Sequence, residues 1–319
     1  MLGTGACVPD RIVGNSEVGA AAGVDDAWIQ RKTMIRERRW AACDQATSDL
    51  AVTAAEQALE AAGITAADVT AVVVATSTPD RPQPPTASYV QRALGAQGAA
   101  FDINAVCSGF VFALAVADAL VCKTGGHALV IGADIYSRIL NPGDRKTVVL
   151  FGDGAGAVVL GPVAAGRGIR DCRLQTFSEE LDLITVPAGG SRLPCSAEVM
   201  EAGLGYFHMD GRGVRDFVET RLPELVKQFL YDNDESPDRI AHLVPHQANG
   251  VLLDRMIPEL GLTGADIHRT YIDYGNTGAA SIPITLDRAA RSGALKPGDQ
   301  ILLLGFGGGM SVGIGLLEW

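Results

Sequence analysis

Cys107 lies where a thiol could act as a nucleophile. The stretch FDINAVCSGF predicts a strand that ends just before this cysteine and an apolar helix that begins just after it. The unpaired N–H groups and positive dipole end of a helix N-terminus lower the pKa of a thiol there. The small residues Ser108 and Gly109 permit a tight turn. We expect one reactive thiol, Cys107, and interpret four others as small, mostly buried hydrophobes: Cys43, Cys122, Cys172 and Cys195.

Two further polar residues, His246 and Asn276, lie in positions that could face a pocket. His246 comes directly after a strand in LVPHQAN, where polar residues are expected to face a pocket. Asn276 lies between glycines in YGNTGAASIP, which could also be an ordinary turn. We interpret the four remaining histidines as structural: His127, His208, His242 and His268.

Two glycine-rich stretches follow strand-like runs. GFGGGMSVG (305–313) allows close backbone approach and exposed N–H groups, which favours an oxyanion hole. A phosphate-binding loop is the alternative, but no Lys-Ser/Thr follows the glycines. LFGDGAGAVVLG (150–161) is interpreted as a structural turn in which Asp153 anchors the backbone.

The elements that must position these residues occur twice along the chain. A helix over 48–63 precedes a buried strand over 71–78, and a helix over 109–126 precedes another over 127–134. DVTAVVVATST, which begins at residue 68, aligns with DRIAHLVPHQA, which begins at residue 238. This repeat predicts two similar layered halves, 1–165 with the cysteine and 166–319 with His246 and Asn276, and it places the Asn276 junction opposite Cys107. The stretch 180–208 is predicted to be an irregular surface excursion.

Composition excludes several classes of protein. The chain has 319 residues, 47% hydrophobic and 20% charged, so a packed core is expected. Its 26 basic and 37 acidic residues give a net charge of −11, which disfavours binding to nucleic acid or to an anionic membrane. We find no apolar run of about 18 residues and no signal-peptide pattern, and we expect a cytoplasmic protein.

Together, Cys107, His246 and Asn276 resemble the Cys-His-Asn set of the β-ketoacyl-ACP synthase III family of the thiolase superfamily. The resemblance covers nearly the whole chain. Its ordered motifs are DAWIQRKTMIRERRWA, FDINAVCSGF, DRKTVVLFGDGAGAVVLG, LVPHQAN, YGNTGAAS and FGGGMSVG. It implies an α/β protein with the thiolase-like, duplicated five-layer α-β-α-β-α fold, assembled as a homodimer.

The resemblance also implies a reaction. Cys107 would take an acyl group from a CoA or carrier-protein thioester and condense it with a malonyl thioester, with loss of CO₂. His246 and Asn276 would stabilise the enolate, and the N–H groups of Cys107 and Gly308 would form the oxyanion hole. No cofactor is expected, because CoA or phosphopantetheine enters as part of the substrate. The product would be a β-ketoacyl thioester for fatty-acid or polyketide-type biosynthesis.

Substrate contacts carried over from the family are Trp28, Lys32, Arg145, Phe151, Gly211, Ala248, Asn249 and Phe306. Four positions depart from the usual family residue. Lys32 and Val251 replace arginines, Arg215 replaces an aromatic residue, and Gln83 replaces the phenylalanine that gates the partner's acyl pocket. These departures indicate a specialised enzyme whose acyl group is short or polar, unless Gln83 and Arg215 simply turn to solvent.

Two other functions stay open from the sequence. An acyltransferase of this fold could move the acyl group from Cys107 to an alcohol or amine, although such enzymes often carry Asp in place of Asn276. A non-catalytic partner subunit is disfavoured, because subunits of that kind usually lose the cysteine.

Overall fold

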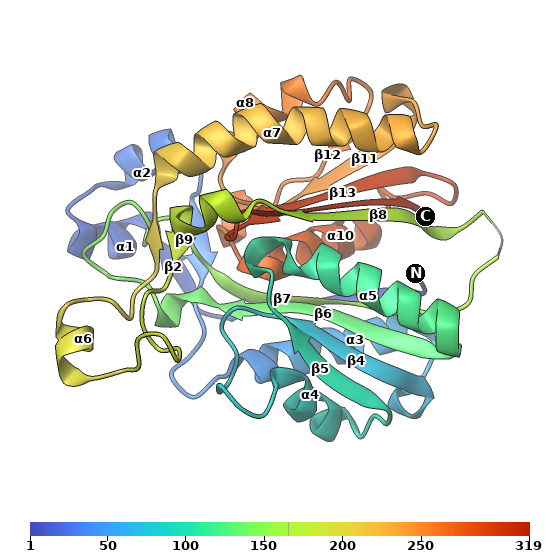
Figure 1. Cartoon of the computed structure of the whole chain (residues 1–319), viewed down its shortest axis with the longest axis horizontal. Helices are drawn as coiled ribbons and strands as arrows, with labels where there is room; N and C mark the ends of the chain where they lie inside the picture. The colour runs from blue at the N-terminus through green and yellow to red at the C-terminus, as the bar shows by residue number, and fades with distance from the viewer. Residues whose placement is uncertain (165) are drawn as a thin grey trace.

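Two five-stranded sheets, with a layer of helices between them, form the centre of the molecule (Figure 1). The computed structural model describes residues 1–164 and 166–319. The strands of the first sheet, in spatial order, are β1 (Gly3–Cys7), β7 (Asp153–Leu160), β6 (His127–Ile135), β4 (Val69–Ala75) and β5 (Ala99–Ile103). Those of the second sheet are β8 (Gly168–Thr176), β14 (Ser311–Glu318), β13 (Gln300–Gly307), β11 (Ile240–Pro245) and β12 (Asp266–Ile267).

The two sheets have the same strand order and the same strand directions. In each sheet three neighbouring strands are parallel, a fourth pairs antiparallel with them, and the outermost strand pairs antiparallel with the fourth. β4 corresponds to β11 and β6 to β13, as the sequence repeat predicts. The chain passes from the first sheet to the second between Leu160 and Gly168. The duplicated fold is therefore confirmed, whereas the exact division into halves at residue 165 stays a prediction.

Helices lie on both outer faces and between the sheets, which gives five layers (Figure 1). The outer helices are α3 (Thr47–Ala62) and α4 (Thr86–Leu94) on the first sheet, and α7 (Gly211–Asp232) and α8 (Gly250–Glu259) on the second. The inner pair is α5 (Gly109–Thr124) and α10 (Ser281–Arg291). The predicted thiolase-like α-β-α-β-α arrangement is confirmed.

Shorter elements complete the described chain. They are β2 (Ile12–Gly14), α1 (Asn15–Ala22), α2 (Asp26–Thr33), β3 (Glu37–Arg39), η1 (Ala66–Asp68), η2 (Val106–Ser108), η3 (Tyr136–Arg138), η4 (Ser178–Leu183), β9 (Ile184–Thr185), α6 (Ala197–Glu201), β10 (His208–Met209), η5 (Pro237–Arg239), α9 (Tyr271–Tyr274) and η6 (Gly278–Ala280). The predicted excursion over 180–208 does leave the layered body, and α6 marks its outer end (Figure 1).

The inner helix α5 corrects one expectation from the sequence. Residues Val106–Thr124 are long and apolar enough to span a membrane by length and composition alone. Phe110, Val111 and Leu114 on this helix are fully buried among residues of both sheets and of α10. Because α5 forms a layer between two sheets, packing explains its apolar sequence.

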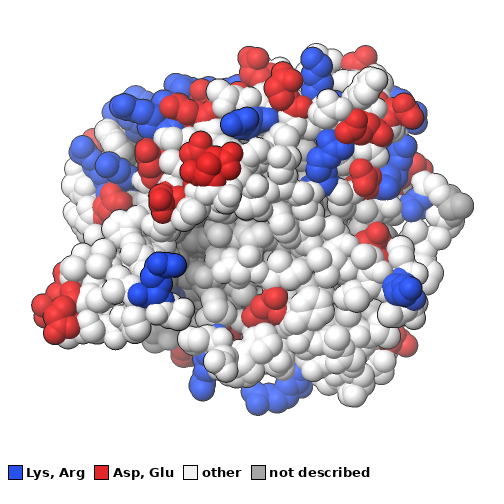
Figure 2. All heavy atoms as spheres, viewed as in Figure 1, with Lys and Arg blue, Asp and Glu red and all other residues white. Residues whose placement is uncertain are grey.

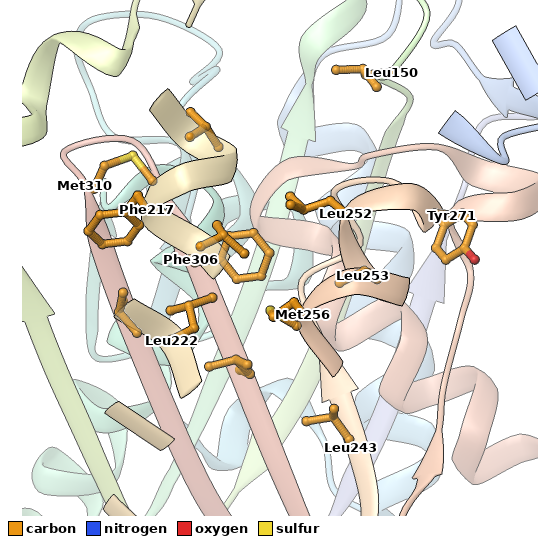
Figure 3. Packing of buried hydrophobic residues seen from close by; sticks show 14 of the residues in the cluster. Leu150, Phe217, Leu222, Leu243, Leu252, Leu253, Met256, Tyr271, Phe306 and Met310 are labelled. Carbon is orange, nitrogen blue, oxygen red and sulfur yellow. The ribbon is translucent and has the colours of Figure 1, made fainter. Parts of the chain in front are cut away.

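The glycine-rich turn after β13 is held by the core on both sides. Phe306 and Met310 flank it, and they lie near Phe217 and Leu222 of α7 in the packed cluster of Figure 3. Full burial of a side chain of this size stabilises the folded protein by about 1.5–3 kcal/mol relative to leaving the side chain exposed. These anchors fix the backbone of the three glycines between them.

The expectation that most cysteines are buried is wrong. Cys107 is buried, and Cys7 and Cys172 are half-buried, whereas the remaining three are exposed: Cys43, Cys122 and Cys195. These three lie in a turn, in the last helical turn of α5 and in the excursion. The structural interpretation of Asp153 is confirmed, because its carboxylate accepts hydrogen bonds from Ala41 N–H and from the N–H and hydroxyl of Ser137.

Candidate active site

Cys107 lies in η2, the turn between β5 and α5. The residue before it, Val106, has φ of +50°, a left-handed conformation that is rare for a β-branched side chain. The Asn104 side chain accepts a hydrogen bond from Val106 N–H at 3.1 Å and helps to hold this turn. Strain of this kind persists only where the surroundings enforce it, and it is frequent at functional sites.

The glycine turn of the second sheet lies directly against Cys107. A Cβ built on Gly307 would lie 2.7 Å from Cys107 N and 2.9 Å from Cys107 Cβ, so only glycine fits there. The hydroxyls of Ser108 and Ser311 are 2.8 Å apart, and Ser311 also donates to the Gly308 carbonyl at 2.9 Å. These contacts fasten the cysteine turn to the glycine turn.

Burial sets the acidity of the Cys107 thiol. The residue is 5% exposed, and desolvation, with a smaller contribution from the Asp134 charge, raises the thiol pKa to about 12. A hydrogen bond with Tyr136 acts in the opposite direction. The lowered pKa expected from the helix N-terminus is therefore wrong, because burial outweighs the helix dipole.

His246 follows β11 and is almost fully buried. Its ring Nδ1 lies 2.8 Å from Ser281 Oγ at the start of α10, and its ring meets Phe306 edge-on at a centroid distance of 5.0 Å. Desolvation lowers the pKa of His246 to about 3, so the ring is neutral at physiological pH.

The amide of Asn276 is oriented by the turn that follows it. Its Oδ1 accepts a hydrogen bond from Gly278 N–H at 2.9 Å, which turns the NH₂ group away from that backbone. Among the described residues, neither Asn276 Nδ2 nor His246 Nε2 has a hydrogen-bond partner, and neither atom is sealed from solvent. An amide NH₂ group and one nitrogen of a neutral imidazole are therefore left for a ligand.

Shared neighbours link the three candidate residues. Phe306, which touches the His246 ring, is followed directly by Gly307, which lies against Cys107. On the other side, the Tyr136 side chain interacts with the Cys107 thiol and lowers its pKa, and it stacks on Phe151 at 4.6 Å. The Phe151 backbone pairs with that of Asn276. The strand ends and helix starts of both halves thus meet around one site.

A cavity of about 270 Å³ leads toward Asn276 from the surface. Four of the predicted contact residues line it: Lys32, Gly211, Ala248 and Asn249. Leu150, Met209, Val214, Arg215, Val251, Leu252 and Arg255 also line it. Trp28 and Arg145 form a separate pair, with the guanidinium 5.8 Å from the Trp ring centroid.

The remaining predicted residues divide into buried and exposed positions. Phe151 and Phe306 are 2% exposed, and each touches a side chain of the site. Gln83 instead lies on an exposed loop, next to the residues 79–82 that line a different cavity. Within one chain, the structure does not bring Gln83 to the site.

Sequence reasoning missed Asp134, Tyr136 and Ser281. Asp134 is fully buried and accepts hydrogen bonds from Ser77 N–H at 2.9 Å and from Ala279 N–H at 2.8 Å, which ties the first half to the turn after Asn276. Tyr136 follows β6, so the criterion of a polar residue after a strand could have found it. Ser281 gives no such signal, because a serine at a helix start usually serves as a cap.

Comparison with known proteins decides the family. The family model described as 3-Oxoacyl-[acyl-carrier-protein (ACP)] synthase III matches residues 101–177, and the model for its C-terminal part matches residues 230–319. The chain is 62% identical over 322 residues to the acetoacetyl CoA synthase NphT7 of Streptomyces sp. (strain CL190), with 100% of this chain and 98% of that protein covered. It belongs to the β-ketoacyl-ACP synthase III family.

Other members of the synthase III family agree. A β-ketoacyl-[acyl-carrier-protein] synthase III of Clostridioides difficile (strain 630) is 42% identical, with 100% of this chain and 98% of that protein covered. The crystal structure of 3-oxoacyl-(acyl carrier protein) synthase III from Pseudomonas aeruginosa PAO1 superposes with a TM-score of 0.91 at 36% identity, over 100% of this chain and 97% of that one. This chain is therefore a transferase that condenses acyl groups, as the members of this family are.

Proposed function

We propose that this synthase III condenses a short acyl-CoA with a malonyl thioester to give a β-ketoacyl-CoA, with acetyl-CoA and malonyl-CoA as the substrate pair. The observation that carries the proposal is a pair of uncharged nitrogens, His246 Nε2 and Asn276 Nδ2, that have no hydrogen-bond partner among the described residues and lie in the same site as the buried Cys107. The relative at 62% identity is named for acetoacetyl CoA synthesis.

In the first half-reaction the Cys107 sulfur attacks the thioester carbonyl carbon. The N–H groups of Cys107 and Gly308 stabilise the oxyanion, CoA leaves as the thiol with the proton that Cys107 gives up, and an acyl-Cys107 thioester remains. In the second half-reaction the malonyl C–C bond breaks and CO₂ leaves. The electron pair forms an enolate whose oxygen accepts hydrogen bonds from His246 Nε2–H and Asn276 Nδ2–H.

The enolate carbon then attacks the acyl carbonyl of acyl-Cys107. The tetrahedral intermediate collapses to the β-ketoacyl thioester, and the departing Cys107 thiolate takes up a proton from solvent. The two donors suit this step because neither changes charge, since His246 is neutral and an amide does not titrate. The proposed steps require no bound cofactor.

An aromatic cluster next to Cys107 supports a short acyl group. Tyr136 and Phe151 are stacked, and Phe207 packs edge-on against both, at centroid distances of 5.7 and 4.9 Å. Phe207 is held there by its backbone N–H, which donates to the Ile139 carbonyl at 2.7 Å. We expect Phe207→Ala to extend the accepted acyl-CoA from acetyl toward butyryl and hexanoyl.

The charges around the entrance favour CoA over a carrier protein. Lys32, Arg215 and Arg255 line the mouth, but Arg215 is paired with Asp216, and Arg255 lies 3.6 Å from Glu219. Figure 2 shows acidic and basic side chains interspersed over α7 and α8. An acidic carrier protein is attracted by a continuous basic surface, whereas the phosphates of CoA need only single cations such as Lys32.

Steady-state assays with matched donors test this function. We expect acetyl-CoA with malonyl-CoA to give acetoacetyl-CoA and CO₂, and malonyl-carrier protein to be the poorer extender. Intact-protein mass spectrometry should show acetylation of the wild type and not of Cys107→Ser. Preference for an alcohol or amine acceptor without CO₂ release would favour plain acyl transfer, and absence of any acyl-enzyme would favour a non-catalytic subunit.

We also propose a homodimer that pairs through β5 and the outward side of α5. Among the described residues β5 is an edge strand that pairs with β4, and its Phe101 and Ile103 are half-buried. Val116 on α5 is 37% exposed, and the surface over α5 and β5 carries few charges in Figure 2. A second copy would cover this face and continue the sheet. Light scattering should give a dimer, and Val116→Asp should shift it toward monomer.

We place the enzyme in the cytoplasm, where CoA thioesters are made, and in specialised rather than housekeeping metabolism. A priming β-ketosynthase from the R1128 polyketide pathway, with a TM-score of 0.91 at 33% identity over 99% of this chain and 95% of that one, supports a polyketide-type context. A labelled product traced into a β-keto-derived metabolite in the producing cell would test this context.

A further inference from the structure

We propose that Ser281 is a positioning residue: its hydroxyl donates to His246 Nδ1 and so keeps the ring hydrogen on Nε2. This inference rests on the proposed function, in which His246 Nε2–H donates to the enolate oxygen. Ser281 would act on the reaction only through the tautomer of the histidine.

Ser281 and His246 are both buried, and their side chains are in hydrogen-bond contact. Ser281 Oγ and His246 Nδ1 are 2.8 Å apart, Ser281 is fully buried, and His246 is 2% exposed. The edge-on contact with Phe306 fixes the plane of the imidazole. The ring therefore presents Nδ1 to α10, and its other nitrogen lies on the far edge of the ring.

Counting hydrogens assigns the direction of this bond. In the chain that the structure describes, Ser281 Oγ has a second partner, Gln247 N–H, which donates to it at 3.4 Å. If His246 Nδ1–H donated as well, the serine hydroxyl hydrogen would be left buried without an acceptor, which is unfavourable. The arrangement that satisfies every group has Ser281 Oγ–H donating to Nδ1.

The histidine has one hydrogen to place, so the tautomer matters. Burial lowers the pKa of His246 to about 3, and the doubly protonated ring, which would donate from both nitrogens, is not populated at neutral pH. A neutral ring with its hydrogen on Nδ1 would offer the enolate a lone pair instead of a donor. The serine therefore selects the one neutral form that can stabilise negative charge.

At the start of α10 the Ser281 hydroxyl contacts His246 and does not serve as a helix cap. Ala280 occupies the N-cap position, and the helix has no side-chain cap. The Ser281 carbonyl accepts the Thr285 hydroxyl at 2.7 Å, and Thr285 and Thr270 hydroxyls are 2.6 Å apart. This second network anchors the first turn of α10 without touching His246.

The test compares Ser281→Ala with wild type on the full-length enzyme labelled with ¹⁵N in histidine. In wild type, we expect NMR to show His246 Nε2 as the protonated nitrogen and Nδ1 as the unprotonated one. In Ser281→Ala we expect a mixture of tautomers. Malonyl-CoA decarboxylation should fall about 10- to 100-fold, while acetylation of Cys107 changes less than about 3-fold.

Two further variants keep the inference falsifiable. Thr285→Val removes a buried hydroxyl one turn along α10 and should lower the melting temperature without changing the His246 tautomer. Ser281→Cys keeps a weaker donor at the same position and should give an intermediate tautomer ratio, even if Ser281→Ala does not fold. An unchanged tautomer in the folded Ser281 variants would overturn the inference. A wild-type enzyme that does not decarboxylate malonyl-CoA would overturn the proposed function instead, while the NMR comparison would still decide what Ser281 does.

Discussion

The main chain of Asn276 is paired with the main chain of Phe151, a residue of the other half of the protein. Asn276 N–H donates to the Leu150 carbonyl at 2.8 Å, and the Asn276 carbonyl accepts from Gly152 N–H at 3.0 Å. The position of Asn276 is therefore set by its backbone, and its side chain is left to act on a ligand.

Asn276→Ala should separate folding from chemistry. Because the backbone pairing remains, we expect only the loss of the hydrogen bond to Gly278, about 1 kcal/mol of stability. Decarboxylation of malonyl-CoA should fall about 100- to 1,000-fold, since one of two enolate donors is gone. Cys107 should still be acetylated, which intact-mass spectrometry can follow. Equal loss of both half-reactions would contradict the enolate role.

The raised pKa of Cys107 predicts a pH-dependent first half-reaction. With the thiol pKa at about 12, the thiolate fraction grows about tenfold per pH unit below that value. We therefore expect the pre-steady-state acetylation rate to rise steadily from pH 6 to pH 9, with no plateau. A plateau near neutral pH would mean that substrate binding or the helix dipole brings the thiol pKa down.

Such experiments need mass spectrometry and not alkylation, because three other thiols are exposed. A variant in which Cys43, Cys122 and Cys195 are all replaced by serine provides the matched background. Its acetylation should equal that of wild type.

Tyr136→Phe should slow acetylation by raising the Cys107 pKa further. The hydroxyl of Tyr136 lowers that pKa through its hydrogen bond, and it lies 2.8 Å from Ser77 Oγ. Loss of one neutral hydrogen bond corresponds to about 0.5–1.5 kcal/mol, or a rate lower by about 2- to 13-fold. The ring remains to stack on Phe151, so the acyl-chain preference should not change. A rate equal to wild type at every pH would show that the hydroxyl does not act on the thiol.

Burial of neutral His246 should make the protein sensitive to acid. The unfolded histidine binds a proton below about pH 6.5, whereas the folded one does so only near pH 3. The free energy of unfolding should therefore decrease as pH falls from 6.5 toward 3, by about 1.4 kcal/mol per pH unit from this residue. Urea unfolding of wild type and His246→Gln at several pH values measures the difference in slope. Parallel slopes for the two proteins would contradict it.

Gly307→Ala should disable the site while the sheets remain intact. The new methyl group would meet Cys107 N at 2.7 Å, so the cysteine turn must move. We expect acetylation to fall at least 100-fold, about the effect of losing an oxyanion-hole donor. Gly315→Ala is the matched control in the adjoining strand, because its methyl group would make ordinary contacts at 3.7 Å with Cys172 and Leu303. Similar losses in both variants would indicate a general packing defect.

How much of this could be predicted from the sequence depends on the range of the interaction. The repeat of 68–78 in 238–248 predicts equivalent strands, and β4 and β11 occupy equivalent places. Strand ends direct attention to Cys107 and His246, because buried strands end in polar residues at few points, and the repeat directs it to Asn276 at the junction equivalent to that of Cys107. These are local patterns, and they can be recognised in a single amino-acid sequence.

Properties that depend on surroundings could not be predicted. The pKa of Cys107 is set by burial and by Asp134, which lies on a different strand, and the local helix start predicts the opposite direction. The partner of His246 Nδ1 comes from Ser281, and nothing near either residue in the sequence indicates the other. The prediction that most cysteines are buried fails for the same reason. Whether another layer of the fold covers Cys43 or Cys122 does not depend on the residues next to them in the sequence.

The pairing of α5 with α10 between the sheets has an evolutionary consequence. Neither sheet can cover its inner face with its own helix alone, since Phe110 of α5 and Ile282 of α10 share one cluster with strands of both sheets. An ancestor that encoded a single half would have needed a second copy of itself, with identical residues on both sides of the axis. Two halves joined in one chain are free of that constraint: one places a thiol at the start of its inner helix, and the other places the amide of Asn276 at the equivalent junction.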